Sequence, residues 1–564
     1  MTAVLGIDLG TERSSAAVAV VTGPGAAPAV VANVTIPTAA WAAGSGRIVA
    51  GEKAILLAKA DRETLARFAM RLAGRTFRTP WIREYVSRAP CSIVEGPGGF
   101  AAFEYGGKAT APAELLAATL EELKKVTETL CGRSAERAVI AVPALFDVFQ
   151  RRAVRDAALI AGIDRFELAC SPLCAALACG PGGGGKRRVV VVDLGAGFLE
   201  VAVLLNEGPS VKVVGYGGDV FLGGQDLARE REDEALSGGP DAAPAAGLTP
   251  RQAEGVAASV RKAICALGAE PGKADRVILL GGVFKAEEAG EPLRGIFGDG
   301  PSIHEGPPEA VAEGAALLGL LEPGALEDVV PYSLGLETEG GGYSEIVARN
   351  ERFPGSRFGF FTPASEGQTE ASVLVVQGAG DHGVPAMAVG RYELKGLAPR
   401  PLGETLVKVG FGFSGQLPTT VTAGDTRGAV ETFRLRPMAG LSEEEALSKA
   451  LAAEIRRSGA GRGKEFAGLA DAAERLAAAV TRLRGAEDPR AIGEAWGQAS
   501  GLAEGFRRKA DAASARLGPE GASVGALASR LRGLVPPEPP VAALGTGAAG
   551  TGLAEYRYGF PPES

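Results

Sequence analysis

The sequence predicts a two-lobed α/β domain, followed by an antiparallel β domain and a C-terminal group of helices. Three observations lead to this fold class. Strand and helix patterns alternate over about the first 300 residues, and the strand, aspartate and glycine turn at 6–10 recurs at 191–195. Apolar segments of strand length with glycine-rich turns follow from about residue 327. Helical spacing then dominates from about residue 441.

The first lobe is expected to open with a hairpin of strands within 3–21, and a helix follows from Pro112 with leucines on one side. A buried strand from Arg137 is expected to end at Pro143. The next segment is expected to form a helix that Gly162 closes.

The second lobe repeats this pattern with an apolar strand, Asp193, a glycine turn and a second strand. A third strand is expected to end at the paired glycines Gly281 and Gly282. The strands expected in the antiparallel domain cover 369–378, 385–396, 404–413 and 429–438. The last thirty residues or so are rich in proline, glycine and alanine, which is typical of a flexible tail.

Composition excludes several classes of protein. The formal net charge of −8 argues against a general nucleic-acid binder. No apolar stretch is long enough to span a membrane, and no secretion signal precedes the first strand, so we expect a cytoplasmic protein without a membrane partner. The six cysteines form no CxxC pair, and His304 and His382 are the only histidines, which disfavours zinc sites and histidine-based catalysis.

Two matched glycine turns carry the chemistry. Asp8 to Thr11 and Asp193 to Gly197 each follow an apolar strand, so their backbone N–H groups are free to approach phosphate oxygens. An aspartate at such a turn is suited to hold the waters of a bound Mg²⁺. One turn of this kind also fits an ordinary hairpin. The pair, together with Gly281 and Gly282, is the pattern of the actin-like ATPase superfamily, in which two lobes close on a nucleotide.

The sequence resembles the heat-shock protein 70 chaperones along nearly its whole length. The matching stretches are GIDLGTERSSAAVAV, FAMRLAGRTF, AVIAVPALFDVFQRRAVRDAALIAGI, VVDLGAGFLEVAV, GGDVFLGGQDL, DRVILLGG, PPEAVAEGAALLGLL and DVVPYSLGLET. A sugar kinase of the same superfamily is disfavoured, because a β domain and helices follow the second lobe.

The resemblance implies an actin-like nucleotide-binding domain at 1–322, an interdomain linker at 323–329, a peptide-binding β-sandwich at 330–439, a helical lid at 440–535 and a flexible tail at 536–564. It implies ATP or ADP with Mg²⁺ as cofactor. It also implies unfolded or extended polypeptides as clients, and a cochaperone as a further partner.

The resemblance assigns roles to individual residues of the nucleotide domain. The catalytic and water-mediated Mg²⁺ roles fall on Asp8, Thr11 and Asp193, with the two aspartates facing the metal. Pro143 and Arg151 match the interdomain switch. The expected nucleotide-binding residues are Gly10, Thr11, Glu12, Arg13, Gly195, Ala196, Gly197, Gly223, Gly224, Gly281 and Gly282.

Several expected polar groups are replaced. Met70 stands where the family has a lysine, Ser171 where it has a glutamate, and Phe198 where it has a threonine near the γ-phosphate. Glu200 takes a position usually held by aspartate, and Arg13 is a speculative substitute for the missing lysine. Because such groups supply most of the rate in phosphoryl transfer, the sequence predicts a weak or absent ATPase.

The second lobe is shorter than in the family. The subdomain that covers the adenosine is largely deleted, within about 228–248, and one helix follows from about Thr249. Arg261 and Lys262 on that helix would either replace part of the adenine pocket or be ordinary solvated charges.

The resemblance also places a peptide site in the β domain. The expected peptide-binding residues are Leu336, Thr338, Glu339, Phe361, Ala364, Gln368 and Ala371. Glu339 replaces an apolar residue and Ala371 a larger one, which predicts a wider pocket; alternatively, these strands only pack a sandwich core. Glu327 and Asp328 interrupt a linker that is leucine-rich in the family, so weaker interdomain coupling is expected.

Three functions remain open at this point. The first is a divergent chaperone that binds extended polypeptide and has a weak or lost ATPase. The second is a catalytically inactive scaffold or regulatory protein without nucleotide cycling. The third is an ordinary ATP-driven foldase in which a residue such as Arg13 performs the missing role.

Overall fold

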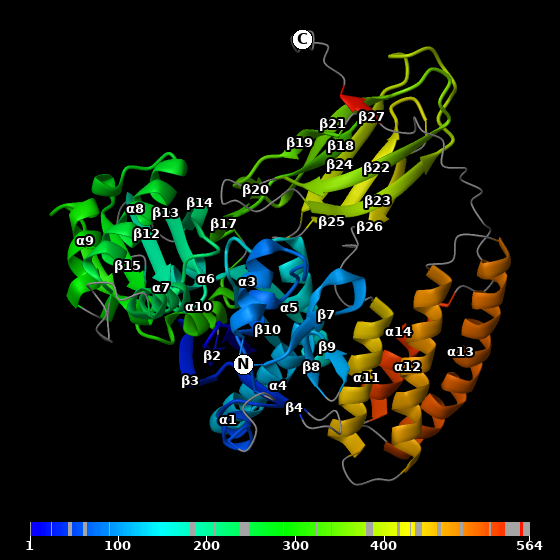
Figure 1. The fold of residues 1–564 in the computed structure, drawn as a ribbon, viewed down its shortest axis with the longest axis horizontal. Helices are drawn as coiled ribbons and strands as arrows, with labels where there is room; N and C mark the ends of the chain where they lie inside the picture. The colour runs from blue at the N-terminus through cyan, green and yellow to red at the C-terminus, as the bar shows by residue number, and fades with distance from the viewer. Residues whose placement is uncertain are drawn as a thin grey trace.

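The computed structural model gives the arrangement of the whole chain (Figure 1). The structure describes residues 2–23, 25–42, 48–59, 65–89, 91–105, 107–180, 186–207, 210–236, 248–285, 287–322, 324–339, 341–378, 387–413, 415, 418–428, 430–434, 443–459, 464–484, 489–517, 521–535 and 553–555. Within this part of the chain, no helix has both the length and the apolar character needed to cross a membrane.

The first lobe is built on a five-stranded sheet of order β11-β10-β1-β2-β3. Its strands are β1 Thr2–Asp8, β2 Arg13–Val21, β3 Ala29–Pro37, β10 Arg137–Val142 and β11 Phe166–Cys170. Helices α4 Pro112–Cys131 and α5 Val148–Ile160 pack on one face of it. The predicted strand that ends before Pro143 and the helix that follows it are therefore confirmed as β10 and α5.

Smaller elements extend the first lobe on the side of α4. They are β4 Ala39–Ala42, β5 Ile48–Ala50, α1 Glu52–Leu57, β6 Leu65–Arg67, α2 Ala69–Leu72, α3 Pro80–Arg88, β7 Ile93–Glu95, β8 Ala101–Tyr105 and β9 Lys108–Thr110. β4, β5 and β6 form one three-stranded sheet, and β7, β8 and β9 form another.

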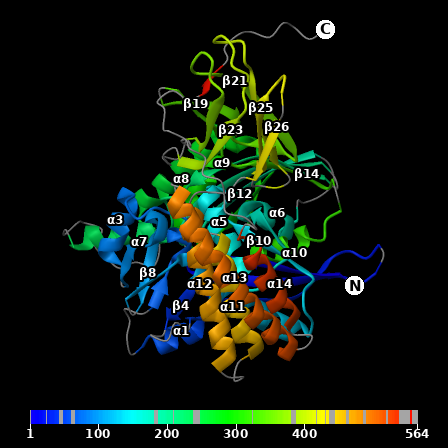
Figure 2. The same ribbon diagram turned by 90° about the vertical axis from the view of Figure 1, so that its right-hand side faces the viewer.

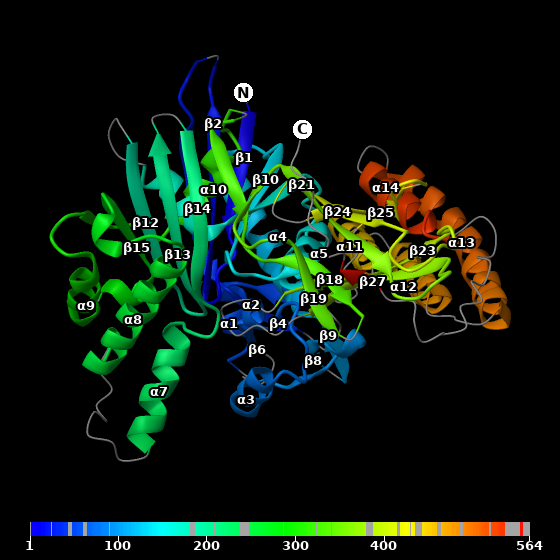
Figure 3. The ribbon, with the colours of Figure 1, turned by 90° about the horizontal axis from the view of Figure 1, so that it is seen from above.

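The second lobe has a seven-stranded sheet of order β16-β15-β12-β13-β14-β17-β20. Its strands within the lobe are β12 Lys186–Leu194, β13 Leu199–Glu207, β14 Ser210–Asp219, β15 Arg276–Leu280 and β16 Ser302–Glu305. Its outer helices are α7 Gly224–Leu236, α8 Pro250–Ala266 and α9 Glu287–Phe297, which Figure 3 shows along one side of the sheet.

Two helices lie between the sheets of the two lobes. α6 Ser171–Ala178 and α10 Ala310–Leu318 share one apolar core with strands of both lobes. The helices cross closely at Gly314, where any Cβ would collide with the carbonyl oxygen of Cys174. Glycine is therefore required at this crossing, which holds the base of the cleft together.

The β domain is a sandwich of two antiparallel sheets, of order β19-β18-β22-β23 and β26-β25-β24-β21-β27. Its strands are β18 Leu334–Thr338, β19 Gly342–Val347, β21 Gly355–Pro363, β22 Glu370–Gln377, β23 Met387–Lys395, β24 Val407–Phe413, β25 Pro418–Asp425 and β26 Val430–Arg434. β20 Glu351–Phe353, which precedes β21, is the edge strand of the second-lobe sheet. One apolar cluster fills the space between the two sheets.

The helical part is a four-helix bundle with its own apolar core. Its helices are α11 Glu443–Gly459, α12 Lys464–Arg484, α13 Pro489–Leu517 and α14 Gly521–Arg532. Figures 1 and 2 show the bundle beside the first lobe and away from the far end of the sandwich.

Some predicted boundaries fall outside the described residues. These are the sandwich-to-lid boundary at 439/440, the first linker residue 323 and most of the tail from 536 to 564. The tail was expected to lack structure, but its residues Leu553–Glu555 form a strand, β27, that pairs with β21. Without β27, this edge of β21 would present unpaired N–H and C=O groups, which another strand can bind. The composition of the tail does not reveal such a partner.

Helix α11 docks the bundle on the first lobe through one of its faces. Lys449 pairs with Glu114 at 2.9 Å, and Arg457 approaches Glu121 at 3.8 Å. Ala453, one helical turn from each of these cations, is 5% exposed and belongs to the core of the first lobe. Leu447 and its neighbours on the other face belong to the bundle core, so α11 is shared between two packing units.

Replacing Ala453 with glutamate is expected to release the bundle from the first lobe. The new carboxylate would be buried among apolar groups of the first lobe, and the cations one turn away already contact Glu114 and Glu121, so its burial costs several kcal/mol unless the interface opens. Faster hydrogen exchange in α4 and α5, with α12 to α14 unchanged, would report the release. The same substitution at Ala478, an exposed position of α12, serves as control; equal exchange in both variants would contradict the docking role of this face.

Candidate functional site

Two glycine turns contact each other where the two lobes meet. The first joins β1 to β2 and the second joins β12 to β13, so each lies at the end of a central strand. A Cβ on Gly197 would collide with the hydroxyl of Thr11, which shows that the two turns are in direct contact. Thr11 is buried and its side chain is held at this contact, while Glu12 and Arg13 are exposed to solvent.

Three carboxylates gather behind these turns. Burial, reinforced by the negative charge of Asp193, raises the pKa of Asp8 to about 7. Burial also raises the pKa of Asp193 to about 6 and raises that of Glu200, which accepts a hydrogen bond from Ala144 N at 2.5 Å. Such a set gains from a nearby cation, and carboxylates are groups that hold Mg²⁺ directly or through its bound waters.

Replacing Asp8 with asparagine is expected to stabilise the cation-free protein at high pH. The folded protein holds protons on Asp8 and Asp193 up to pH 6–7, whereas the unfolded chain loses them near the ordinary value of 3.8. Stability is therefore lost as pH rises from about 4 to 7. In EDTA, we expect the variant to melt about 3 °C above the parent at pH 8, about 1 °C above it at pH 5 and at nearly the same temperature below pH 4.

The Asp8→Asn variant also tests whether Asp8 and Asp193 form a metal site or are only two buried carboxylates close to each other. Added Mg²⁺ is expected to raise the melting temperature of the parent at pH 8, with little effect at pH 5 or on the variant. Asp164→Asn, which neutralises an exposed acid, should behave like the parent throughout. Equal stabilisation of parent and Asp8→Asn by Mg²⁺ would show that the metal binds elsewhere.

An ion pair that the sequence did not predict spans the cleft. The Arg71 guanidinium on α2 contacts the Asp226 carboxylate on α7 at 2.8 Å, and the Arg71 side chain is 1% exposed. The guanidinium also lies over the ring of Trp81, 4.6 Å from its centroid, and 5.9 Å from that of Phe198. The two lobes are thus joined by a buried charge pair beside the second glycine turn.

The replaced family positions are buried in the structure. Met70 is fully buried in the core of the first lobe, so the cation of this segment is its neighbour Arg71. Phe198 is 6% exposed and stacks edge-on against Phe146, with ring centroids 5.4 Å apart. Ser171, 5% exposed, is the first residue of α6.

The other predicted glycines hold the second turn in place. Gly224 N donates to Gly195 O at 2.9 Å, and a Cβ on Gly223 would lie 2.5 Å from Ala196 O. Gly281 has a φ of +105° and packs directly on the backbone of Leu194, so its position requires glycine. Gly282 begins the short turn after β15. Gly10 packs against the backbone carbonyl of Arg13 in the first turn.

A pocket opens between α8 and α9 of the second lobe. Its volume is about 520 Å³, and it is lined by Glu254, Ala257, Ala258, Arg261, Lys262, Cys265, Pro292 and Ile296. The predicted helix from about Thr249 is α8, whose N-cap is the Thr249 hydroxyl. Residues 237–247 lie outside the described part, and the predicted deletion from about 228 falls partly on α7. The pocket has the size of a nucleoside, with two cations at its wall.

The predicted switch residues lie at the base of the cleft. Arg151 is fully buried and donates to the carbonyl oxygens of Phe146, at 2.9 Å, and Ala144, at 2.8 Å, in the turn that follows Pro143. Next to this turn, Val148 N donates to Gln377 of β22 at 3.0 Å. The switch turn is therefore bonded on one side to the carboxylate cluster, through Glu200 and Ala144, and on the other side to the sandwich.

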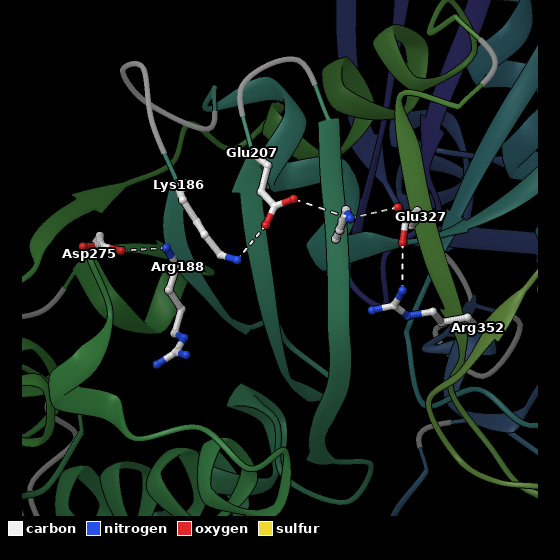
Figure 4. A network of polar contacts seen from close by, with 7 residues as sticks. Lys186, Arg188, Glu207, Asp275, Glu327 and Arg352 are labelled. Atoms are coloured by element: carbon white, nitrogen blue, oxygen red, sulfur yellow. Dashed lines mark hydrogen bonds and ion pairs between the residues drawn. The ribbon is translucent and has the colours of Figure 1, made fainter.

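The linker is docked as a strand, and the expectation that its acids weaken the interdomain coupling stays a prediction. β17 Leu326–Val330 pairs on one side with β14 of the second lobe and on the other side with β20, the short strand at the edge of the same sheet that precedes β21 of the sandwich in the sequence. Figure 4 shows Glu327 between Lys212, at 3.1 Å, and Arg352, at 3.0 Å. The buried Asp328 accepts a hydrogen bond from the Tyr216 hydroxyl at 2.7 Å. Both acids have partners, because basic and phenolic groups on neighbouring strands match them.

The ion-pair chain in Figure 4 continues across the edge of the second lobe. Glu207 contacts Lys186 at 2.8 Å and Lys212 at 3.4 Å, which lowers the pKa of Glu207 and raises that of Lys212. Close by, Arg188 N donates to Asp275 at 2.6 Å. These groups are exposed or half-buried, so their ion pairs add little to the free energy of folding. Their role is to align the linker with β14, through the contact of Lys212 with Glu327.

The predicted peptide-binding residues fall into two groups around β21. Leu336, Phe361 and Ala371 are almost fully buried in the sandwich core. Four lie further out: Thr338 and Ala364 are half-buried, Glu339 is exposed, and Gln368 closes the turn before β22. The structure therefore brings these residues together on β18, β21, β22 and the turns that join them.

Sequence reasoning missed Arg71, Asp226, Tyr216 and Gln377. Arg71 and Asp226 both lie inside stretches that carry the family resemblance. The signal that could have found them is their charge: each is an ionisable residue in a segment that is rich in apolar residues and glycine and is expected to be buried.

Comparison with known proteins agrees with this arrangement. A family model described as Hsp70 protein matches residues 4–233 and 248–495. The chain is 30% identical over 507 residues to the mitochondrial heat shock 70 kDa protein of Dictyostelium discoideum, across 78% of this chain and 76% of that protein. Two nucleotide-binding lobes, a β-sandwich and a helical lid are the organisation of that family, and the order of elements here agrees with it. The chain therefore belongs to the Hsp70 family of molecular chaperones.

Proposed function

We propose that this protein is a chaperone that binds unfolded or extended polypeptide and ATP or ADP with Mg²⁺, and that hydrolyses ATP slowly or not at all. The observation that carries the proposal is the position of Phe198. Its ring lies on the second glycine turn, beside Phe146 and Arg71, where the family has a hydroxyl. An apolar ring there offers no hydrogen bond to developing negative charge.

The residues present support nucleotide binding better than hydrolysis. The raised pKa values of Asp8 and Asp193 favour a nearby cation, and the pocket at Arg261 and Lys262 has the size of a nucleoside. Arg71, the cation nearest to Phe198, is already paired with Asp226. Arg71 would therefore stabilise the negative charge of a transition state only if its ion pair with Asp226 broke.

The docked linker supports coupling between nucleotide and peptide. The Arg151 turn is bonded to Gln377 of the sandwich through Val148, and β17 and β20, which lead into the sandwich, are both paired in the sheet of the second lobe. A cation or phosphate that moves the carboxylate cluster would move this turn through the Glu200 hydrogen bond. Nucleotide binding alone therefore suffices to bias the docking of the sandwich.

Single-turnover ATP hydrolysis, with and without Mg²⁺, tests the catalytic part. We expect a rate at least about 10-fold below that of a typical Hsp70 measured alongside, since one lost charge-stabilising contact costs roughly 10²–10³ in rate. Turnover at the typical rate would overturn the proposal in favour of an ATP-driven foldase. A thermal-shift scan with Mg²⁺ and ATP tests binding separately. No shift at millimolar ATP would favour the scaffold without nucleotide cycling.

A further inference from the structure

Three residues near the C-terminus form a strand on the sandwich. β27 pairs antiparallel with the last part of β21, in the register Phe361 with Glu555, Thr362 with Ala554 and Pro363 with Leu553. β27 also lies beside β18 and β22. Figure 1 shows β27 in red against the green strands of the sandwich, far from the orange helices that precede it in the sequence.

β27 pairs with the edge of β21 and lies beside β18 and β22, and these three strands carry most of the peptide-binding prediction. Phe361 is on β21, Leu336 and Thr338 are on β18, and Ala371 is on β22. A strand edge presents unpaired N–H and C=O groups, and an extended peptide binds such an edge by adding a strand. The C-terminal segment thus makes the kind of backbone pairing that an extended client would make.

The lid bundle leaves this edge accessible. α11 packs on α5 of the first lobe and contacts Glu114 and Ile160 there. Figures 1 and 2 show α11 to α14 along the first lobe, with β27 at the far end of the sandwich. The group that covers the edge of β21 in this arrangement is therefore the chain's own C-terminal segment.

We propose that Leu553–Glu555 is an internal ligand of the β21 edge, which extended clients have to displace. The part of this inference that concerns clients rests on the proposed function, namely the binding of extended polypeptide by the sandwich. A segment tethered to its own site acts at a local concentration of roughly 1 mM. If the free segment binds with a dissociation constant of about 50 µM, the tether raises the apparent dissociation constant of any competitor about 20-fold.

A proline pair tests whether the segment competes for the edge. Along a β-strand, every second N–H group points to the neighbouring strand. The double variant Leu553→Pro with Ala554→Pro therefore removes an N–H group that bonds β27 to β21, whichever of the two residues donates it. The probe is a fluorescein-labelled peptide of residues 549–559, measured by polarisation on the full chain. We expect the proline variant to bind it at least 10-fold more tightly than the parent. Equal binding by the two proteins would overturn the proposal.

Two matched proteins control this comparison. Ala542→Pro with Ala543→Pro places the same prolines in the C-terminal region but outside β27, and should bind the probe like the parent. Thr362→Cys with Ala554→Cys joins a directly opposed pair, whose Cα separation of about 5 Å in an antiparallel ladder suits a disulfide. Oxidation should abolish probe binding, and reduction should restore it to the parent level; persistent binding in the disulfide-linked form would overturn the proposal.

A separate experiment distinguishes two failures: that Leu553–Glu555 is not an internal ligand, and that the protein does not bind unfolded polypeptide. A permanently unfolded, carboxymethylated protein replaces the peptide probe. Tighter binding of this client by the proline variant supports both statements. Equal binding by parent and variant overturns the claim that clients displace the segment. Binding of the 549–559 peptide without any binding of the unfolded protein overturns the proposed function but supports the internal ligand.

Discussion

Replacing Asp226 with alanine is expected to lower the stability of the nucleotide domain by about 3 kcal/mol, because it leaves the Arg71 guanidinium buried without its carboxylate. The Arg71 side chain is 1% exposed and Asp226 is 20% exposed, so water replaces the lost partner poorly. Asp226 also accepts a hydrogen bond from Gly223 N at 2.9 Å, and that bond is lost too. Calorimetry should show the transition of this domain about 5 °C lower.

Two further variants show whether the effect comes from the buried charge. Arg71→Met combined with Asp226→Leu removes both charges and should recover most of the stability. Glu270→Ala breaks an exposed pair with Lys273 and should change stability by less than about 0.5 kcal/mol. A loss of similar size in Glu270→Ala and Asp226→Ala would contradict the special role of the cross-cleft pair.

The order of the elements in the two lobes could be predicted because local signals agree with the fold. The strands that lead to Asp8 and Asp193 are apolar and buried over their last residues before the aspartate, 3–7 and 189–192, as strands buried on both faces should be. The strand before Pro143 and the helix after Thr249 begin or end at residues with clear local preferences. β27 could not be predicted in this way, because a three-residue strand depends on a distant edge and not on its own composition.

The candidate site was predictable where glycine geometry determines it and not where long-range pairing does. Gly197 and Gly281 are recognisable because close backbone contact leaves room for no other residue. The Arg71–Asp226 pair joins residues 155 positions apart, and no local pattern specifies such a partner. The linker acids show the same limit. Glu327 and Asp328 are acids in a strand that docks on another domain. Their partners Lys212, Arg352 and Tyr216 come from neighbouring strands and are not visible in the sequence of the linker.

Tyr216→Phe is expected to loosen the docked linker while leaving the second lobe folded. The Tyr216 ring is fully buried, and its hydroxyl donates to the Asp328 carboxylate at 2.7 Å. Phenylalanine keeps the packing but removes one donor from a buried acid, which costs about 1–3 kcal/mol. The ratio of docked to undocked linker should therefore fall by about 10- to 100-fold. Hydrogen exchange in β17, Leu326–Val330, should accelerate by a similar factor.

Tyr343→Phe is the matched control, since the Tyr343 side chain is 41% exposed and its hydroxyl donates a long bond of 3.3 Å to Ser333. It should leave exchange in β17 unchanged. The main-chain bonds of Tyr216 to Asn350, at 3.1 Å, and Arg349, at 2.7 Å, persist in Tyr216→Phe, so a change in exchange reports the hydroxyl alone. Unchanged exchange in Tyr216→Phe would mean that pairing of β17 with β14 and β20 holds the linker without Asp328. In that case the two domains would be coupled through the Val148–Gln377 contact and not through the linker acids.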